Sequence, residues 1–205
     1  MRTFHIQFLL SATDASQFPQ TNAPEIAFLG RSNVGKSSLI NALLGSQHAR
    51  VSSTPGRTRA INFFALHSAA TQAKPEMIFA DLPGYGYAKI SKSISAEWPK
   101  FIEPYLADRP TLVLCVCLVD MNVPPQESDI QLAHYLQGIG RNTLVVGTKS
   151  DKLSGNGLVK ASQELKRGLG VDRLLPCSAK TKRGIKELWA QMLTIAQGED
   201  APGGE

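Results

Sequence analysis

The chain has 205 residues and a formal net charge of +5, with 22 basic and 17 acidic residues. This length predicts one domain with a tail, and a hydrophobic content of 42% excludes a disordered chain. The longest apolar run, Leu112 to Val119, is far shorter than the roughly 20 residues that span a membrane, and no secretory signal precedes it. We therefore expect a cytoplasmic protein without a membrane partner.

Strands and helices alternate along the chain after an irregular lead-in over residues 1–24, which has room for one short helix or strand. Apolar runs predict strands at Ile26–Leu29, Ile61–Leu66, Met77–Ala80, Leu112–Val119, Thr143–Val146 and Leu174–Leu175. Apolar residues at helical spacing predict helices at Leu39–Leu44, Trp98–Leu106, Ile130–Ile139, Leu158–Leu169 and Ile185–Ala196. Pro104 should kink or shorten the helix that contains it.

The fold class that follows is α/β, because the long apolar run at 112–119 is typical of a strand buried on both faces of a parallel sheet. We expect a mostly parallel central sheet with helices on both faces. One domain should cover residues 25–196, and residues 197–205 should form a disordered tail.

Three cysteines, Cys115, Cys117 and Cys177, lie in apolar surroundings. They form no C-x-x-C pair, and the four histidines form no H-E-x-x-H motif, which argues against a zinc site. We expect buried, reduced thiols, with Cys115 and Cys117 on one face of a strand.

Basic residues are unevenly distributed. Residues 26–75 contain six basic residues and no acidic one, and residues 141–187 contain eleven basic and four acidic residues. This asymmetry fits a polyanionic partner such as nucleic acid, but an ordinary solvated basic surface would look the same.

The segment from Gly30 to Ser37 reads Gly-Arg-Ser-Asn-Val-Gly-Lys-Ser and matches the phosphate-loop pattern G-x-x-x-x-G-K-[ST]. A strand precedes it and a helix follows, as the motif requires. The glycines let backbone N–H groups at the helix N-terminus face a polyphosphate. Lys36 would place a cation on the β- and γ-phosphates, and the Ser37 hydroxyl would ligate Mg²⁺.

Two further motifs follow predicted strands. In Asp81-Leu-Pro-Gly84, the carboxylate would hold Mg²⁺ through water and the Gly84 N–H would reach a γ-phosphate. In Thr148-Lys-Ser-Asp151, the carboxylate would accept hydrogen bonds from N1–H and the 2-amino group of guanine, a donor pair that adenine lacks. A second base-binding loop is expected at Cys177-Ser-Ala179. Each motif alone could be an ordinary turn, but their order makes coincidence implausible.

With these motifs in place, the sequence resembles the TrmE/Era-like GTPases, and most closely the EngB (YihA/YsxC) family of bacterial ribosome-biogenesis GTP-binding proteins. The resemblance covers residues 25–196 and is carried by Gly30–Asn41, Thr54–Arg59, Asp81–Tyr87 and Thr148–Asp151. It implies GTP hydrolysis with Mg²⁺, a role in assembly of the large ribosomal subunit, and a need for the protein in normal cell division and septation. The expected partners are GTP or GDP and the large subunit or its rRNA, bound by a monomer.

The resemblance also assigns site residues. Thr58 would be the switch threonine that closes on Mg²⁺, together with Ser37 and Asp81, and the catalytic candidates are Asn33, Lys36, Thr58 and Gly84. The nucleotide-binding candidates are Gly30, Arg31, Ser32, Asn33, Val34, Gly35, Lys36, Ser37, Ser38, Gly56, Arg57, Thr58, Arg59, Ala60, Asp81, Leu82, Pro83, Gly84, Thr148, Lys149, Ser150, Asp151, Cys177, Ser178 and Ala179.

Two positions depart from the general pattern of this protein class. Thr148 replaces the usual Asn and removes an amide that braces the phosphate loop. Tyr85 stands where Ras-like proteins carry a water-orienting Gln, so intrinsic hydrolysis should be slow, on the order of 10⁻⁴ s⁻¹. Arg57 and Arg59 would either stabilise phosphate charge or contact a partner.

Other interpretations remain open at this point. Asn33 would either help to ligate K⁺, as in potassium-activated members of this group, or simply tolerate a tight loop conformation. A P-loop kinase would need a lid and an acceptor pocket, which no segment marks. A GTP-binding module with negligible turnover is favoured only by the missing Gln.

Overall fold

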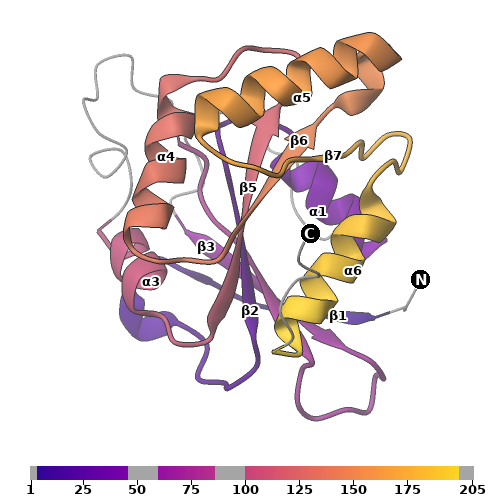
Figure 1. Cartoon of the computed structure of the whole chain (residues 1–205). Coiled ribbons are helices and arrows are strands. Elements are labelled where there is room, and N and C mark those ends of the chain that lie inside the picture. The colour runs from indigo at the N-terminus through magenta and orange to yellow at the C-terminus, as the bar shows by residue number, and fades with distance from the viewer. Residues whose placement is uncertain (1–3, 46–59, 86–99, 199–205) are drawn as a thin grey trace.

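The computed structural model describes residues 4–45, 60–85 and 100–198 (Figure 1). Its helices and strands alternate along the chain as expected. The strands are β1 (His5–Ala12), β2 (Glu25–Gly30), β3 (Ile61–His67), β4 (Met77–Asp81), β5 (Leu112–Asp120), β6 (Thr143–Thr148) and β7 (Leu175–Pro176). The α-helices are α1 (Lys36–Leu44), α3 (Ile102–Asp108), α4 (Glu127–Gly138), α5 (Gly155–Leu169) and α6 (Ile185–Ala196), with 3-10 turns at Ala15–Gln17 and Ser150–Lys152.

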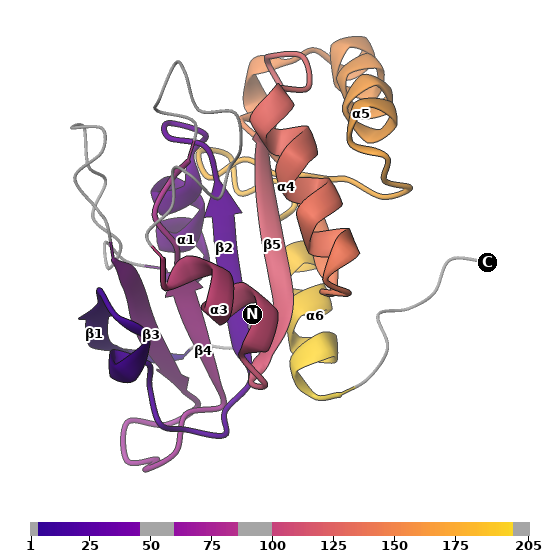
Figure 2. The ribbon, with the colours of Figure 1, turned by 90° about the vertical axis from the view of Figure 1, so that its left-hand side faces the viewer.

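The strands form a single seven-stranded sheet in the order β1-β3-β4-β2-β5-β6-β7. The pairs β4–β2, β2–β5, β5–β6 and β6–β7 are parallel, whereas β3 runs antiparallel to both of its neighbours. The expected mostly parallel sheet is confirmed. In Figure 2 the strands β1, β3, β4, β2 and β5 follow this order from left to right, with α3 in front of the sheet and α4 to the right of β5.

Helices cover both faces of the sheet, as predicted. Side chains of α3, α4 and α5 pack on one face in a cluster that includes Cys115 and Cys117 of β5. Side chains of α1 and α6 pack on the other face, against Leu114 and Val116 of the same strand. The alternation of β5 residues between the two cores explains its continuous apolar sequence.

The three cysteines are free and buried, as expected. Burial raises the pKa of Cys115 and of Cys177 to about 12, so both thiols stay protonated at neutral pH. No helix in the described part of the chain is long and apolar enough to cross a bilayer.

The lead-in contains one strand, β1, and one 3-10 turn within its described residues, 4–24. Strand β1 pairs with β3 at the edge of the sheet, and the register shifts between Phe8 and Leu10. This bulge breaks the two-residue alternation by which an edge strand is recognised from sequence. The Asp14 side chain accepts a hydrogen bond from the Ser16 N–H, and the Gln17 side chain accepts one from the Asp14 N–H. These two bonds cap the 3-10 turn that follows β1.

The helix that contains Pro104 begins later than the predicted start at Trp98, which agrees with the shortening expected from this proline. Helix α3 begins at Ile102, so Pro104 lies in the first turn, where its missing N–H would have no helical acceptor. Ile102, Tyr105 and Leu106 are fully buried, as the helical spacing predicted. Trp98, residues 46–59 and residues 199–205 of the expected tail lie outside the described residues.

Candidate functional site

The predicted motifs meet at one edge of the sheet. Strands β2, β4, β5, β6 and β7 are parallel, so their carboxyl ends lie together. The phosphate loop follows β2, the Asp81–Gly84 segment follows β4, and the two predicted base-binding segments follow β6 and β7. Open α/β sheets bind their ligands at this edge.

The phosphate loop curls back onto the sheet through left-handed backbone conformations at Asn33 (φ 64°) and Gly35 (φ 105°). Gly30 packs so tightly that a Cβ there would lie 2.7 Å from Val34 Cγ1. Helix α1 begins immediately after the loop, at Lys36. The free N–H groups of its first turn therefore border the loop, the arrangement that binds phosphate.

Lys36 joins the phosphate loop to the end of β4. Its ammonium group forms an ion pair with Asp81, and both side chains are about one-tenth exposed. Gly84 lies against the loop as well, because a Cβ on it would come within 3.0 Å of Ser32 Oγ. Ser32 N–H donates to the Tyr85 carbonyl at 3.1 Å. The residues predicted for the two phosphate-facing segments are thus brought together.

Thr148 keeps the brace that its replacement of Asn was expected to remove. Its hydroxyl donates to the carbonyl of Val34 at 2.6 Å, and the Val119 carbonyl lies 3.1 Å from the same oxygen. A side-chain hydroxyl at the end of β6 thus reaches the phosphate loop directly. The expectation of a lost brace is therefore wrong, because strand and loop approach closely enough for a hydroxyl to bridge them.

Lys149 spans the same gap with its longer side chain. Its ammonium group donates to the Asn33 carbonyl at 2.8 Å and forms an ion pair with Asp120 at 2.7 Å. Asn122 donates to the other Asp120 oxygen at 2.9 Å and to the Lys149 carbonyl at 3.2 Å. Burial raises the pKa of Asp120, but these hydrogen bonds outweigh burial and lower it, so the carboxylate stays ionised.

Asp151 is held by the second base-binding segment. Ser178 donates to its carboxylate at 2.7 Å, and Ser178 in turn accepts a hydrogen bond from the Thr181 N–H. The Ser178 hydroxyl is the main cause that lowers the pKa of Asp151. The carboxylate is therefore ionised and oriented, as a group that accepts two guanine hydrogens must be.

A pocket of about 630 Å³ opens between these segments. It is lined by residues from Gly35–Gly45, Thr148–Lys152 and Cys177–Lys182. This volume falls within the range of roughly 300–1,000 Å³ for small-molecule sites. Asp151 lines the pocket together with Lys149, so its predicted place at the base end of the site fits the geometry.

Some predicted residues have side chains that are buried in the protein. The side chains of Val34, Leu82 and Cys177 are buried in the two cores. Arg31 also turns away from the loop, because its guanidinium pairs with Asp129 of α4 at 3.0 Å. Its side chain is therefore engaged with α4, and its predicted place in the phosphate loop concerns its backbone. The candidates Gly56, Arg57, Thr58 and Arg59 lie outside the described residues, and Ala60 is buried beside β3.

Comparison with known proteins agrees with this geometry. A family model described as "50S ribosome-binding GTPase" matches residues 25–149. A probable GTP-binding protein EngB from Acidobacterium capsulatum is 66% identical over 190 residues, which cover 93% of this chain and 90% of the relative. A second EngB protein, from Koribacter versatilis, is 57% identical over 96% of each chain. The chain belongs to the EngB family of GTP-binding proteins.

The resemblance drawn from the motifs is thereby confirmed, and the protein is a GTPase. The P-loop kinase and the binding module without turnover are set aside. A crystal structure of another probable EngB protein matches the fold with a TM-score of 0.65 at 23% identity, over 85% of this chain and 100% of that one. This likeness shows that the EngB fold is shared.

Three residues that hold the site together lie outside every sequence motif. Asp120, Asn122 and Asp129 belong to no motif, and Asp129 is 98 positions away from the Arg31 that it binds. Only Asp120 could have been suspected from the sequence, because it directly follows the predicted strand Leu112–Val119 and ligands bind at the carboxyl ends of parallel strands.

Replacing Thr148 with Val should weaken GDP and GTP binding alike, by roughly fivefold, because one neutral hydrogen bond to the phosphate loop is worth about 1 kcal/mol. Thr148→Ser keeps the hydroxyl and should bind as the wild type does. Titration calorimetry with both nucleotides measures the effect. Equal affinities for Thr148→Val and Thr148→Ser would contradict the brace.

Proposed function

We propose that this GTPase is a molecular switch that assists assembly of the large ribosomal subunit in the cytoplasm, acting as a monomer. The resemblance to the EngB family, drawn from the sequence motifs, further implies that the protein is needed for normal cell division and septation. The observation that carries the proposal is a group of exposed basic side chains beside the nucleotide pocket: Lys180, Lys182, Arg183 and Lys186. RNA phosphates bind such surfaces. The name of the matching family model supports the same partner.

Not every basic residue of this region is free to meet RNA. Arg141 donates to backbone carbonyls around the start of β5, including that of Leu112 at 3.0 Å. Lys149 is engaged with Asp120. Lys180 and Lys182 line the nucleotide pocket, so replacing them would disturb GTP binding as well. Arg183 and Lys186 are exposed and do not line it, which makes them the sharper probes.

The variant Arg183→Glu/Lys186→Glu should bind ribosomal subunits more weakly, and the negative slope of log affinity against log salt should become less steep by about 2. Co-sedimentation with ribosomal subunits, with GDP and with a non-hydrolysable GTP analogue, tests this expectation. The variant Lys160→Glu/Arg167→Glu makes the same charge change on exposed positions of α5. Association that is insensitive to salt and equal for both variants would contradict the proposed face.

We further propose that the site uses Mg²⁺. Ser37 in the first turn of α1 and Asp81 at the end of β4 offer hard oxygen donors, and Thr58 would add a third. One or two protein oxygens with phosphate oxygens and water suit Mg²⁺. The ion would neutralise charge that develops on the β- and γ-phosphates. Lys36 would hold the same phosphates, and the Gly84 N–H would fix the γ-phosphate.

Slow intrinsic hydrolysis is also proposed, since Tyr85 is 2% exposed and its hydroxyl donates to Asp129 at 3.1 Å. The side chain that stands in place of the Ras-like Gln is therefore directed into the protein. A partner or a cation would have to supply the missing stabilisation of the transition state.

Hydrolysis should run faster in K⁺ than in Na⁺ at equal ionic strength if Asn33 helps to hold a monovalent cation. Asn33 has an exposed side chain and φ 64°, a conformation that Asn tolerates, so the loop-conformation role stands beside the cation role. Asn33→Gly keeps this conformation available and removes the amide. Single-turnover rates in both salts test the role. The K⁺ acceleration should vanish in Asn33→Gly, and equal rates in both salts for the wild type would contradict it.

A further inference from the structure

A buried carboxylate on α4 connects the two phosphate-facing segments. Asp129 is 4% exposed. One of its oxygens accepts hydrogen bonds from Arg31 Nε at 3.2 Å and from the Tyr85 hydroxyl at 3.1 Å, and its other oxygen accepts from Arg31 Nε at 3.0 Å. Arg31 belongs to the phosphate loop, and Tyr85 follows Gly84 directly. No motif contains Asp129, and so far it has served only as the acceptor that directs the Tyr85 side chain into the protein.

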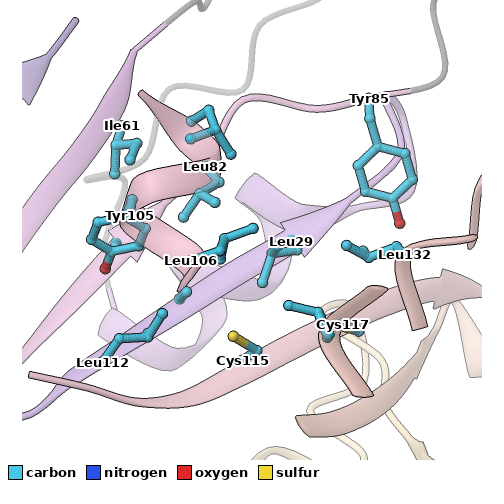
Figure 3. Close-up of a cluster of buried hydrophobic side chains, with 14 of the residues drawn as sticks. Leu29, Ile61, Leu82, Tyr85, Tyr105, Leu106, Leu112, Cys115, Cys117 and Leu132 are labelled. Carbon is cyan, nitrogen blue, oxygen red and sulfur yellow. The ribbon is translucent and has the colours of Figure 1, made fainter. Parts of the chain in front are cut away.

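The backbones of the two segments are joined at the same point. Arg31 and Tyr85 form a parallel bridge outside the regular strands, and the Ser32 N–H donates to the Tyr85 carbonyl at 3.1 Å. Tyr85 belongs to the hydrophobic cluster shared by α3 and α4. In Figure 3 its hydroxyl oxygen lies on the side of the ring where Leu132 of α4 is drawn. Both the ring and the hydroxyl thus hold Tyr85 in place.

The buried Asp129 carboxylate and the Arg31 guanidinium balance each other's charge. Burial raises the pKa of Asp129, and the nearby Arg31 guanidinium opposes this rise. Loss of its charge would leave the Arg31 cation, whose side chain is 22% exposed, without its counter-charge. Gly84 lies against the phosphate loop, since a Cβ on it would be 3.0 Å from Ser32 Oγ. Because Gly84 directly precedes Tyr85, a shift of Tyr85 would move the Gly84 peptide relative to that loop.

We propose that Asp129 is a positioning residue for GTP hydrolysis, which acts through Arg31 and Tyr85 to hold the Gly84 N–H against the phosphate loop. The proposal rests on the assignment of Gly84 to the γ-phosphate. Only GTP has that phosphate, so Asp129 affects GTP and its hydrolysis more than it affects GDP.

Asp120 provides a matched comparison within the same site. It is also a carboxylate that pairs with a site cation, but its partner Lys149 lies at the base end of the pocket. Both nucleotides share the base, so Asp120→Asn lowers GDP and GTP affinity by the same factor. Both Asp→Asn changes remove one carboxylate charge from a pair with a site cation, but Asp129 pairs with Arg31 and Asp120 with Lys149, which lines the nucleotide pocket.

The experiment measures three quantities for Asp129→Asn, Asp120→Asn and Tyr85→Phe: GDP affinity, affinity for a non-hydrolysable GTP analogue, and the single-turnover rate of GTP hydrolysis. In Asp129→Asn the hydrolysis rate falls about tenfold, because a charge-assisted hydrogen bond is lost, while GDP affinity stays within about twofold of wild type. Tyr85→Phe lowers the rate in the same selective way and adds less in the Asp129→Asn background than it does alone.

Two results would overturn the proposal: an equal loss of GDP and analogue affinity in Asp129→Asn, or additive effects of the two substitutions. If Asp129→Asn unfolds below the assay temperature, Tyr85→Phe gives the same test with the ring packing preserved. Gly84→Ala tests the assignment of Gly84 to the γ-phosphate on its own. The variant keeps the N–H, but its Cβ would lie 3.0 Å from Ser32 Oγ and would push the peptide away from the phosphate loop. Wild-type hydrolysis in Gly84→Ala rejects the γ-phosphate role of Gly84, whereas slow hydrolysis there with a normal rate in Asp129→Asn rejects the positioning role alone.

Discussion

Asp151→Asn should lower GDP affinity by about 10²–10⁴-fold, because two charge-assisted hydrogen bonds to the guanine edge are lost. The Asp151 carboxylate lines the pocket and is oriented by the Ser178 hydroxyl at 2.7 Å. An amide in its place has one acceptor and presents N–H groups, which complement the 2-oxo group of xanthine. Preference should therefore shift toward xanthine nucleotides.

Competition binding of GDP, XDP and ADP to wild type and variant measures this shift. Sites built on such hydrogen bonds reject the wrong ligand by roughly 10⁴–10⁵, so ADP should not compete with GDP in the wild type. Asp172→Asn is the matched control, since it removes the same charge from an exposed position outside the pocket. Equal affinity of the wild type for ADP and GDP would refute the assignment.

Lys36→Ala should slow GTP hydrolysis by about 10²–10³-fold, the usual cost of removing one preorganised group that stabilises transition-state charge. The change also removes the ion-pair partner of Asp81, a carboxylate that is 7% exposed. Some loss of thermal stability is therefore expected beside the loss of activity. Ser37→Ala should act differently, because it removes a Mg²⁺ ligand and should weaken GTP more than GDP.

Single-turnover hydrolysis and nucleotide titrations with and without Mg²⁺ separate these two effects. Lys160→Ala removes a lysine from an exposed position of α5 and should leave all values unchanged. Wild-type hydrolysis by Lys36→Ala would show that another cation serves the phosphates. A wild type that binds GTP equally well with and without Mg²⁺ would contradict the role given to Ser37.

Local chemistry explains why so much of the site was predictable. A phosphate loop is built from consecutive residues, so Gly30, Gly35 and Lys36 reveal it without knowledge of any distant contact. The Asp81 and Asp151 segments each follow an apolar strand, and the parallel order of those strands brings them to one edge of the sheet. The continuous apolar sequence of β5 indicated a parallel sheet, because helices cover both faces of such a strand.

The sequence by itself thus determined the fold class, the EngB family and the residues whose roles depend on their immediate neighbours in the chain. Only the tertiary structure decided which side chains meet across long separations. The Arg31 guanidinium turns toward Asp129, the Thr148 hydroxyl reaches Val34, and β1 pairs with β3. The physical reason is that a hydrogen bond or ion pair between distant segments depends on how strands and helices pack, and neither periodicity nor spacing records that packing.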